Sequence, residues 1–249
     1  MEVIQAMSYS QQVKQLREEG YTIVRQAISP EDVLRYKNLI IDYFKDGQNL
    51  CHHTTASTPQ TIKSDAINDP HFKELVEVYG NEKMLPILKE VSQDKLMWVH
   101  HSDVHMNYGD AKGYHSDNQL RHIANDNYSG NFLHQEYRVY RIATYFQDHY
   151  DNDGGFYVMP GSHLNSSLNE ERYLKTKAGD AIIFDCTLQH KGGTYKDDRF
   201  AFFTALGLDN QYSELHAKGV LHRYAKQNKS SYVLQDYVKQ KMEQLNIKC

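Results

Sequence analysis

The chain has 249 residues, of which 40% are hydrophobic, which is enough for one sizeable buried core. Its 28 basic and 32 acidic residues give a net charge of -4 without a dense run of lysine and arginine, so we expect no nucleic-acid partner. Three widely spaced cysteines, no secretory signal and no apolar run near the roughly 18 residues of a membrane span predict a cytoplasmic protein without a disulfide scaffold.

The first third of the chain is expected to be mostly helical. Apolar residues recur at helical spacing over three stretches, and one stretch begins with Ser29 as an N-cap and Pro30 in the first turn. Residues 46–70 are rich in Gly, Ser, Thr and Asn and have no clear period, so we expect a long loop or lid there. The expected helices cover residues 10–19, 30–44 and 72–91, and a β-branched strand is expected over 21–24.

The pattern changes after the third helix to short β-rich runs broken by Gly, Asn and Asp. These runs cover residues 96–108, 137–146, 155–159, 181–184 and 199–206. Helices followed by strands favour an α+β fold with a mainly β core, a double-stranded β-helix (a cupin-like jelly roll) with N-terminal and C-terminal helices packed outside. We expect one domain over 1–249, with a helical and strand part over about 1–95, the jelly-roll core over about 96–210 and a helical segment over about 211–249 that includes an amphipathic helix at 230–245.

One tripeptide in the β-rich half suits a metal site. Non-haem iron(II) sites in oxygenases use two imidazoles and one carboxylate on one side of the ion, which leaves the other side open. Residues two apart in an extended segment point the same way, so His115 and Asp117 can bind one ion while Ser116 points away. His190 follows the apolar run 181–185 and is the expected third ligand, from a later strand.

The same tripeptide occurs twice, so the two copies must be compared. His101-Ser102-Asp103 lies inside a continuous run of strand-forming residues, where alternation explains it as one face of a strand. His115 instead follows a glycine-containing turn, where a ligand is open to solvent and substrate. We therefore favour His115 and Asp117, and the first copy is the alternative.

Arg199 stands at the start of an apolar strand and needs an anion. Its planar guanidinium matches a carboxylate such as the distal one of 2-oxoglutarate. The alternative is a surface salt bridge with Asp197, Asp198 or Asp209. Because Arg199 follows the expected ligand His190 by nine positions, we favour the co-substrate.

Taken in order, these motifs resemble the phytanoyl-CoA dioxygenase family of iron(II)- and 2-oxoglutarate-dependent oxygenases, which includes hydroxylases of free small molecules. The resemblance covers most of the chain. It rests on Glu18 to Arg25, Ser29-Pro30-Glu31, Gly113 to Asp117, Asp153 to His163, Gly179 to Phe184 and His190 to Arg199. It implies that His115, Asp117 and His190 bind iron(II) as the catalytic centre, that Arg199 binds 2-oxoglutarate, and that O2 is the second co-substrate.

The resemblance also points to further residues of the co-substrate pocket. Family members place a polar residue on the strand before the His-x-Asp motif, for which Asn107 is the first choice and His105 the competitor. Thr144, on the strand at 142–146, is expected to line the same pocket. The alternative for these residues is ordinary hydrogen bonding within the strands.

The segment after the motif bears on the substrate. Residues 118–135 are rich in amide side chains, and Gln119 and Arg121, together with His105, are the candidate contacts of a small polar molecule. No basic cluster suits the phosphates of coenzyme A, which favours a free metabolite or a natural-product intermediate over an acyl-CoA.

The activity that the resemblance implies is hydroxylation of an unactivated C–H bond, with succinate and CO2 as co-products. We expect the protein to be a monomer or a homodimer. Desaturation or ring formation is a variant of the same chemistry. Two different functions compete with it: a jelly-roll binding protein without oxygenase activity, and a zinc- or manganese-dependent hydrolase or isomerase with the same three ligands.

Overall fold

The computed structural model describes residues 7–45, 61–106, 113–117, 136–150, 154–168, 170–193, 199–228 and 232–249. Within these ranges the strands are β1 (Tyr21–Val24), β2 (Thr61–Ser64), β3 (Leu96–Met106), β4 (Val139–Tyr145), β5 (Phe156–Val158), β6 (Arg172–Leu174), β7 (Ala181–Asp185), β8 (His190–Gly192) and β9 (Phe200–Leu208). The helices are α1 (Tyr9–Glu19), α2 (Pro30–Phe44), α3 (Leu85–Ser92), α4 (Gln211–Asn228) and α5 (Asp236–Gln244), with 3-10 helices η1 (Ala66–Asn68) and η2 (Pro70–Gly80).

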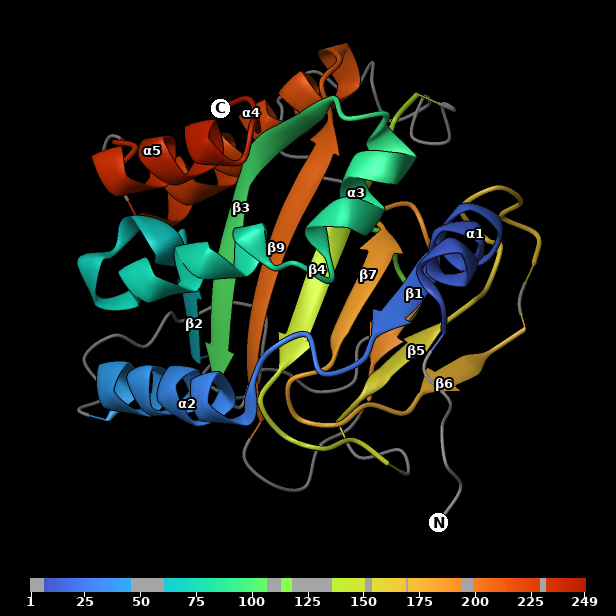
Figure 1. Ribbon diagram of the computed structural model, residues 1–249, viewed down its shortest axis with the longest axis horizontal. Helices are drawn as coiled ribbons and strands as arrows, with labels where there is room; N and C mark the ends of the chain where they lie inside the picture. Colours follow the sequence, from blue (N-terminus) through green and yellow to red (C-terminus); the bar gives the residue numbers. More distant parts are fainter. Residues whose placement is uncertain are drawn as a thin grey trace.

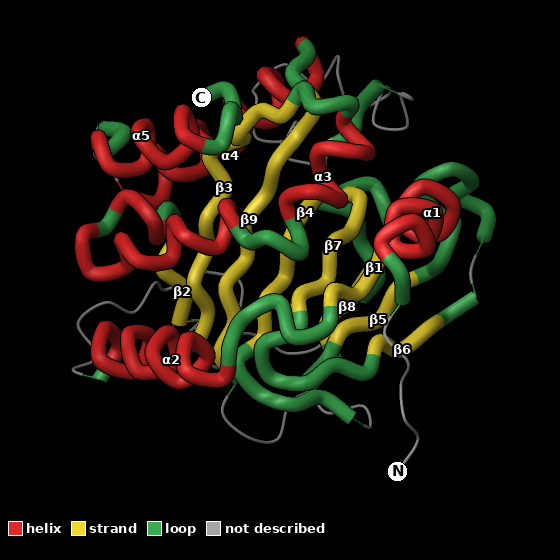
Figure 2. The backbone as a smooth tube through the Cα atoms, in the orientation of Figure 1, coloured by secondary structure: helices red, strands yellow, loops and turns green. Residues whose placement is uncertain are grey.

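Two antiparallel sheets form the core of the fold. The larger sheet has six strands in the order β1-β7-β4-β9-β3-β2, and the smaller has three in the order β6-β5-β8. Figure 1 and Figure 2 show the short strands β5 and β6 at the end of the molecule that also carries β1. This arrangement confirms the predicted double-sheet jelly roll with helices packed outside it.

Helices cover one face of the larger sheet. In Figure 1, α2, η2, α3 and α5 lie in front of this sheet, and their apolar residues form one core with Tyr140 and Ile142 of β4. Helix α1 ends where the sequence predicts, because Gly20 takes a left-handed φ of 81°. Helix α2 begins at the predicted cap, where the Ser29 hydroxyl accepts a hydrogen bond of 3.1 Å from the backbone nitrogen of Asp32.

The opposite, inner face of the larger sheet is covered in two parts. Ala143 and Tyr145 of β4 pack with Phe156 of β5 in the smaller sheet. Elsewhere on this face, Val99 of β3 belongs to a core that includes Ala217 of α4. Because side chains alternate along a strand, β4 separates the helix-covered outer face from an inner face enclosed by the smaller sheet and α4.

Three short strands differ from the expectation drawn from the sequence. The predicted loop at 46–70 contains β2 and η1, so that prediction is wrong for residues 61–64 and 66–68, while 46–60 lie outside the described ranges. Strand β2 forms by pairing with the edge of β3. Strand β6, of three residues, was not predicted, and β8, also of three residues, was expected only as a later strand without bounds that carries His190. Pairing between segments distant in sequence leaves no periodic signal in such short stretches.

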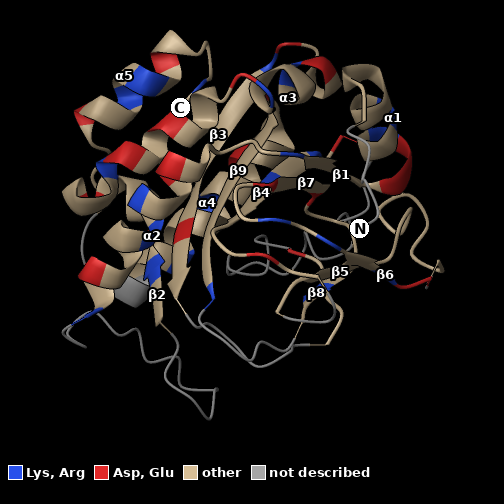
Figure 3. Ribbon diagram, turned by 60° about the horizontal axis from the view of Figure 1, so that its bottom comes forward, with Lys and Arg blue, Asp and Glu red and all other residues tan. Residues whose placement is uncertain are grey.

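Charged residues of both signs share the surface helices. Figure 3 shows basic and acidic residues on both α1 and α5. They are Lys14, Arg17, Glu18 and Glu19 on α1, and Asp236, Lys239, Lys241 and Glu243 on α5. In the part of the chain that the structure describes, no helix has the length and apolar character needed to cross a membrane.

Candidate metal centre

His115 and His190 face each other across a short antiparallel bridge. The backbone nitrogen of His115 donates to the carbonyl of His190 at 3.0 Å, and the nitrogen of His190 donates back at 2.9 Å. Asp117 is held beside them by a hydrogen bond of 2.8 Å from its backbone nitrogen to the carbonyl of Cys186, just after β7. Two segments that are distant in sequence are thus fixed side by side.

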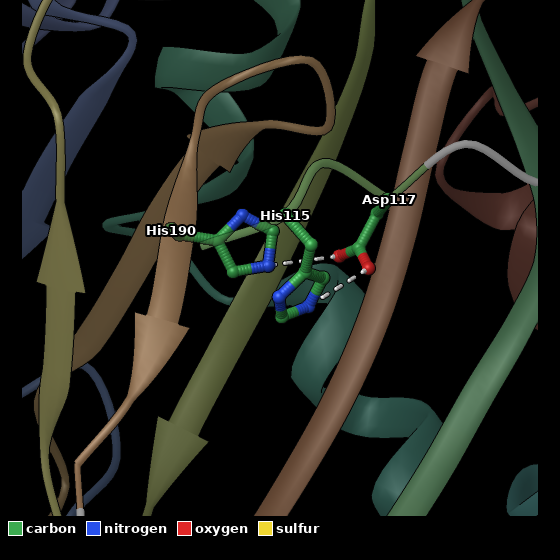
Figure 4. A group of neighbouring side chains, drawn as sticks. All are labelled: His115, Asp117 and His190. Carbon is green, nitrogen blue, oxygen red and sulfur yellow. Dashed lines mark ion pairs between the residues drawn. The ribbon is translucent and has the colours of Figure 1, made fainter. Parts of the chain in front are cut away.

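The three side chains turn their ligand atoms toward one point, as Figure 4 shows. Nδ1 of His115 lies 3.0 Å from the carbonyl of Gly113, and Nδ1 of His190 lies 2.9 Å from that of Leu188. Each Nδ1 therefore carries the proton, which leaves each Nε2 with a free lone pair. These Nε2 atoms lie 3.4 Å (His190) and 4.0 Å (His115) from the Asp117 carboxylate, and the ligand atoms are all within 4.8 Å of one another.

Packing holds the rings in this orientation. The His190 ring is stacked on Phe156 with centroids 5.1 Å apart and has its edge against Phe184 at 4.8 Å. Ser116, between the two ligands of the tripeptide, donates its hydroxyl to the carbonyl of Thr187 at 3.0 Å. The same hydroxyl accepts a hydrogen bond of 2.7 Å from the amide of Gln189, so Ser116 anchors the tripeptide to the turn before β8.

The electrostatic surroundings favour the protonation states that bind metal. Burial alone would raise the pKa of Asp117, but the charge of Arg141 and the two imidazoles outweigh burial and hold this pKa well below its usual range. Burial, followed by the neighbouring His190, lowers the pKa of His115. An ionised carboxylate and a neutral imidazole are the forms that bind a divalent metal, and two nitrogens with one oxygen suit iron(II).

The first His-x-Asp copy has a different environment. His101 and Asp103 on β3 are 0% and 4% exposed, and His101 Nε2 lies 2.9 Å from Oδ2 of Asp103. The Asp103 carboxylate also accepts hydrogen bonds from Arg223 at 2.9 Å and from the Tyr224 hydroxyl at 3.1 Å, both on α4. Hydrogen-bond donors of the protein therefore already surround the Asp103 carboxylate. Among the described residues, only His115, Asp117 and His190 bring three metal-type side chains together.

Arg199 lies inside the fold and not on its surface. It is 8% exposed, its guanidinium lies 5.2 Å from the centre of the Tyr145 ring, and Nη2 donates to the Tyr145 hydroxyl at 3.1 Å. Tyr145 belongs to the inner core between the two sheets. Of the salt-bridge partners that the sequence left open, Asp209 pairs with Lys248 at 2.6 Å, and residues 197 and 198 lie outside the described ranges.

The remaining predicted pocket residues lie in different places in the structure. The His105 ring packs on Phe203 of the inner core, with centroids 4.7 Å apart, so His105 lies on the inner face. Thr144 does not line this pocket, because its neighbours in β4, Ala143 and Tyr145, point inward and Thr144 therefore points to the helix-covered face. The predicted contacts Asn107, Gln119 and Arg121 lie outside the described residues.

Sequence reasoning missed Arg141. This residue lies in the middle of β4, is 9% exposed, and donates a short hydrogen bond from Nη1 to Oδ2 of Asp117. The signal that could have found it is a charged residue within a strand whose seven residues are all buried. A buried charge needs a partner, and here the partner is a predicted metal ligand.

Comparison with solved structures shows which proteins share this fold. The non-heme alpha-ketoglutarate-dependent epimerase SnoN from nogalamycin biosynthesis shares 14% identity over 80% of this chain and 81% of its own, with a TM-score of 0.63. SnoN has also been solved in complex with Fe3+, alpha-ketoglutarate and nogalamycin RO. The carbocyclase SnoK from the same biosynthesis has 14% identity, coverage of 80% and 83%, and a TM-score of 0.60. AviO1 from Streptomyces viridochromogenes Tue57 has 11% identity, coverage of 82% and 97%, and a TM-score of 0.61.

At these identities the structural matches establish the fold, while the sequence itself establishes the family. No curated protein matches the chain significantly. The sequence profile of the phytanoyl-CoA dioxygenase family matches residues 16–200, a span that contains His115, Asp117, His190 and Arg199. With most of its length and all of its candidate ligands inside this match, the chain belongs to the phytanoyl-CoA dioxygenase family.

Proposed function

We propose that the chain is an iron(II)- and 2-oxoglutarate-dependent oxygenase that hydroxylates an unactivated C–H bond of a small molecule. The observation that carries this proposal is the convergence of His115 Nε2, His190 Nε2 and the Asp117 carboxylate on one point. Family membership and the inward position of Arg199 support it. The two imidazoles, whose Nδ1 atoms are both fixed by backbone carbonyls, favour a metal site over a jelly roll that binds no metal.

His115, Asp117 and His190 are the residues that would hold the iron. The backbone carbonyls of Gly113 and Leu188 keep both rings in the metal-binding tautomer, and Phe156 and Phe184 keep the His190 ring from rotating. Bound iron and 2-oxoglutarate supply the oxidising power from O2, with succinate and CO2 as co-products.

Arg199 is the proposed partner of the distal 2-oxoglutarate carboxylate. A guanidinium can bind that carboxylate with two parallel hydrogen bonds, which are strong in a site sheltered from water. Tyr145 fixes the guanidinium through its hydroxyl and its ring. Burial lowers the pKa of His105 on the same face to about 3, so this imidazole is neutral and offers polar contact without charge.

Anaerobic titration with iron(II) and 2-oxoglutarate tests the proposal. A chelated co-substrate is expected to give a weak visible charge-transfer band, and admission of air is expected to release succinate even without the primary substrate. Absence of both the band and the succinate would overturn the oxygenase assignment and favour a binding protein.

A pair of arginine variants makes this test specific. Arg199→Met is expected to weaken 2-oxoglutarate binding at least tenfold, about what one lost charge-assisted pair costs. Arg25→Met is the matched control, because Arg25 also pairs with a buried aspartate, Asp180, at 2.6 Å, whereas neither residue belongs to the converging group of ligands. Equal losses in the two variants would contradict the role of Arg199.

Epimerisation or ring closure is the second candidate reaction. It is favoured by the match to SnoN and SnoK, which are described as an epimerase and a carbocyclase. Both reactions use the same cofactors, so the product distinguishes them. A hydroxylase adds 18O from 18O2 to the product, whereas an epimerase or carbocyclase product gains no oxygen.

The proposed substrate is a small polar metabolite or a natural-product intermediate. This part of the proposal rests on the amide-rich sequence of residues 118–135, with Gln119 and Arg121. A panel of free acids, amides and their coenzyme A esters tests it through substrate-stimulated succinate release. Stimulation by the esters alone would overturn it.

A further inference from the structure

Arg141 connects the candidate metal centre to the first His-x-Asp copy. Its Nη1 donates to Oδ2 of Asp117, and its Nη2 lies 3.2 Å from Nε2 of His101. The guanidinium also lies 5.4 Å from the centre of the Phe203 ring. Three different segments therefore surround this side chain, which is 9% exposed. Nε2 of His101 cannot both donate to Asp103 and accept from Arg141, so the Asp117 carboxylate is the hydrogen-bonding anchor of the guanidinium.

The partners of Arg141 are themselves fixed. His101 contacts Asp103 at 2.9 Å, and Asp103 accepts hydrogen bonds from Arg223 and Tyr224 of α4. The result is a buried polar chain from Asp117 through Arg141, His101 and Asp103 to α4. The first tripeptide thus supports the arginine that contacts the second tripeptide.

This geometry restricts how Asp117 can bind a metal ion. A carboxylate has two oxygens, and the one engaged by Arg141 is Oδ2. Oδ2 also lies 3.4 Å from Nε2 of His190, but it already accepts the Arg141 hydrogen bond. Oδ1, which lies 4.0 Å from Nε2 of His115, is therefore the oxygen more open to a metal. A carboxylate that used both oxygens would occupy one more position on the ion, and a bidentate co-substrate needs that position.

The charges lead to a second consequence. With Arg141 beside Asp117, a divalent ion bound by this carboxylate would give a site of net charge about +2 instead of about +1. A site of that charge attracts a dianion such as 2-oxoglutarate. The same arginine repels the metal ion itself, so its effects on the two ligands have opposite signs.

We propose that Arg141 is a positioning residue that keeps Asp117 a one-oxygen metal ligand and favours the dianionic co-substrate at the expense of metal affinity. The claim about 2-oxoglutarate affinity rests on the proposed function. The claim about metal affinity rests only on the contact between Arg141 and Asp117. This assignment also gives the first, buried tripeptide a role, because His101 and Asp103 lie beside the arginine that contacts Asp117.

Two affinities measured on Arg141→Met test the proposal. Calorimetry with Co(II), without 2-oxoglutarate, is expected to give a dissociation constant about tenfold smaller than wild type, by analogy with the smallest effect of a nearby charge on proton binding. The charge-transfer band of the iron(II) protein is expected to give a 2-oxoglutarate dissociation constant about tenfold larger, an effect of the same size for the loss of one positive charge near a dianion. Arg141→Lys, which keeps the charge, should lie closer to wild type in both.

The opposite signs separate this role from simple structural damage. A variant that only loosens the fold weakens both affinities, and that result, or two unchanged affinities, would overturn the proposal. Arg25→Met is the control and should change neither. If Arg141→Met does not fold, Arg141→Gln removes the charge while keeping a hydrogen-bond donor, and the same opposite changes are expected of it.

The test also distinguishes failure of this inference from failure of the proposed function. If wild-type protein gives no band with iron(II) and 2-oxoglutarate, the proposed function fails. The Co(II) measurement then still tests whether Arg141 lowers metal affinity. Tighter Co(II) binding by Arg141→Met supports that claim, and unchanged or weaker binding rejects it.

Discussion

The two His-Ser-Asp tripeptides of this chain are identical in sequence and differ in what surrounds them. In the first, His101 and Asp103 contact each other, and α4 supplies further donors to the carboxylate. In the second, backbone carbonyls occupy the Nδ1 atoms of His115 and His190, and the Nε2 atoms remain directed at Asp117. We propose that the second copy binds the metal because its Nε2 lone pairs are left free, whereas the tripeptide residues alone do not distinguish the two copies.

Replacing the histidine of each copy should separate them most strongly. His115→Ala removes one of three ligands, so we expect Co(II) affinity to fall at least a hundredfold, the upper end of what even indirect changes at metal sites cost. His101→Gln keeps a polar side chain on β3 and should retain metal binding while lowering the unfolding temperature. Calorimetry and thermal unfolding measure the two effects. The reverse pattern would assign the metal to the first copy.

Asp103→Asn tests whether the first copy is structural. Arg223 would lose its charged partner, and because its side chain is 18% exposed we expect the free energy of unfolding to fall by about 3 kcal/mol, the low end for a broken buried pair. Urea denaturation measures this loss. The folded variant should still bind Co(II), since Asp103 is not among the converging ligands. A folded Asp103→Asn protein without metal binding would contradict this division of roles.

Acid should destabilise the strand that carries the first copy. Burial lowers the pKa of His100 to about 4, below the pKa of this residue in the unfolded chain. Between these two pKa values His100 is protonated in the unfolded chain and neutral in the native state. The native state thus loses stability as pH falls from about 6.5 toward 4, by at most about 2 kcal/mol for this residue between pH 6.5 and 5. Asn suits the left-handed φ of 57° at His100.

Urea denaturation of metal-free protein at pH 7 and pH 5 measures the difference. Wild type should lose more stability than His100→Asn over this interval. Equal losses in both proteins would show that His100 does not contribute to the acid sensitivity.

Replacing the serine in the middle of each tripeptide, Ser116 or Ser102, should give the smallest difference in metal affinity between the two copies. Ser116→Ala removes two hydrogen bonds that tie the second tripeptide to the turn before β8. We expect a loss of about 1 kcal/mol in stability and a severalfold weaker metal affinity, because the ligands on both sides become less constrained. Ser102→Ala, at the same place in the first copy, should leave metal affinity unchanged. Similar metal affinities for the two variants would count against this constraint.

The sequence was sufficient where the signal is local. Gly20 and Ser29 mark the ends of two helices by their own conformational preferences. The turn before His115 favoured the second tripeptide as the metal ligand, which stays a prediction. Thr144 was placed wrongly because all seven residues of β4 are buried, so no polar and apolar alternation reveals which face points inward. The contact between Arg141 and Asp117 arises only when β4 is in its place in the sheet.

The most direct test of the central claim is the location of the metal itself. Crystals of the protein grown with Mn(II) and 2-oxoglutarate should give one strong anomalous peak, bonded to Nε2 of His115, Nε2 of His190 and one oxygen of Asp117. A peak between His101 and Asp103, or ordered crystals with no peak at either tripeptide, would contradict it.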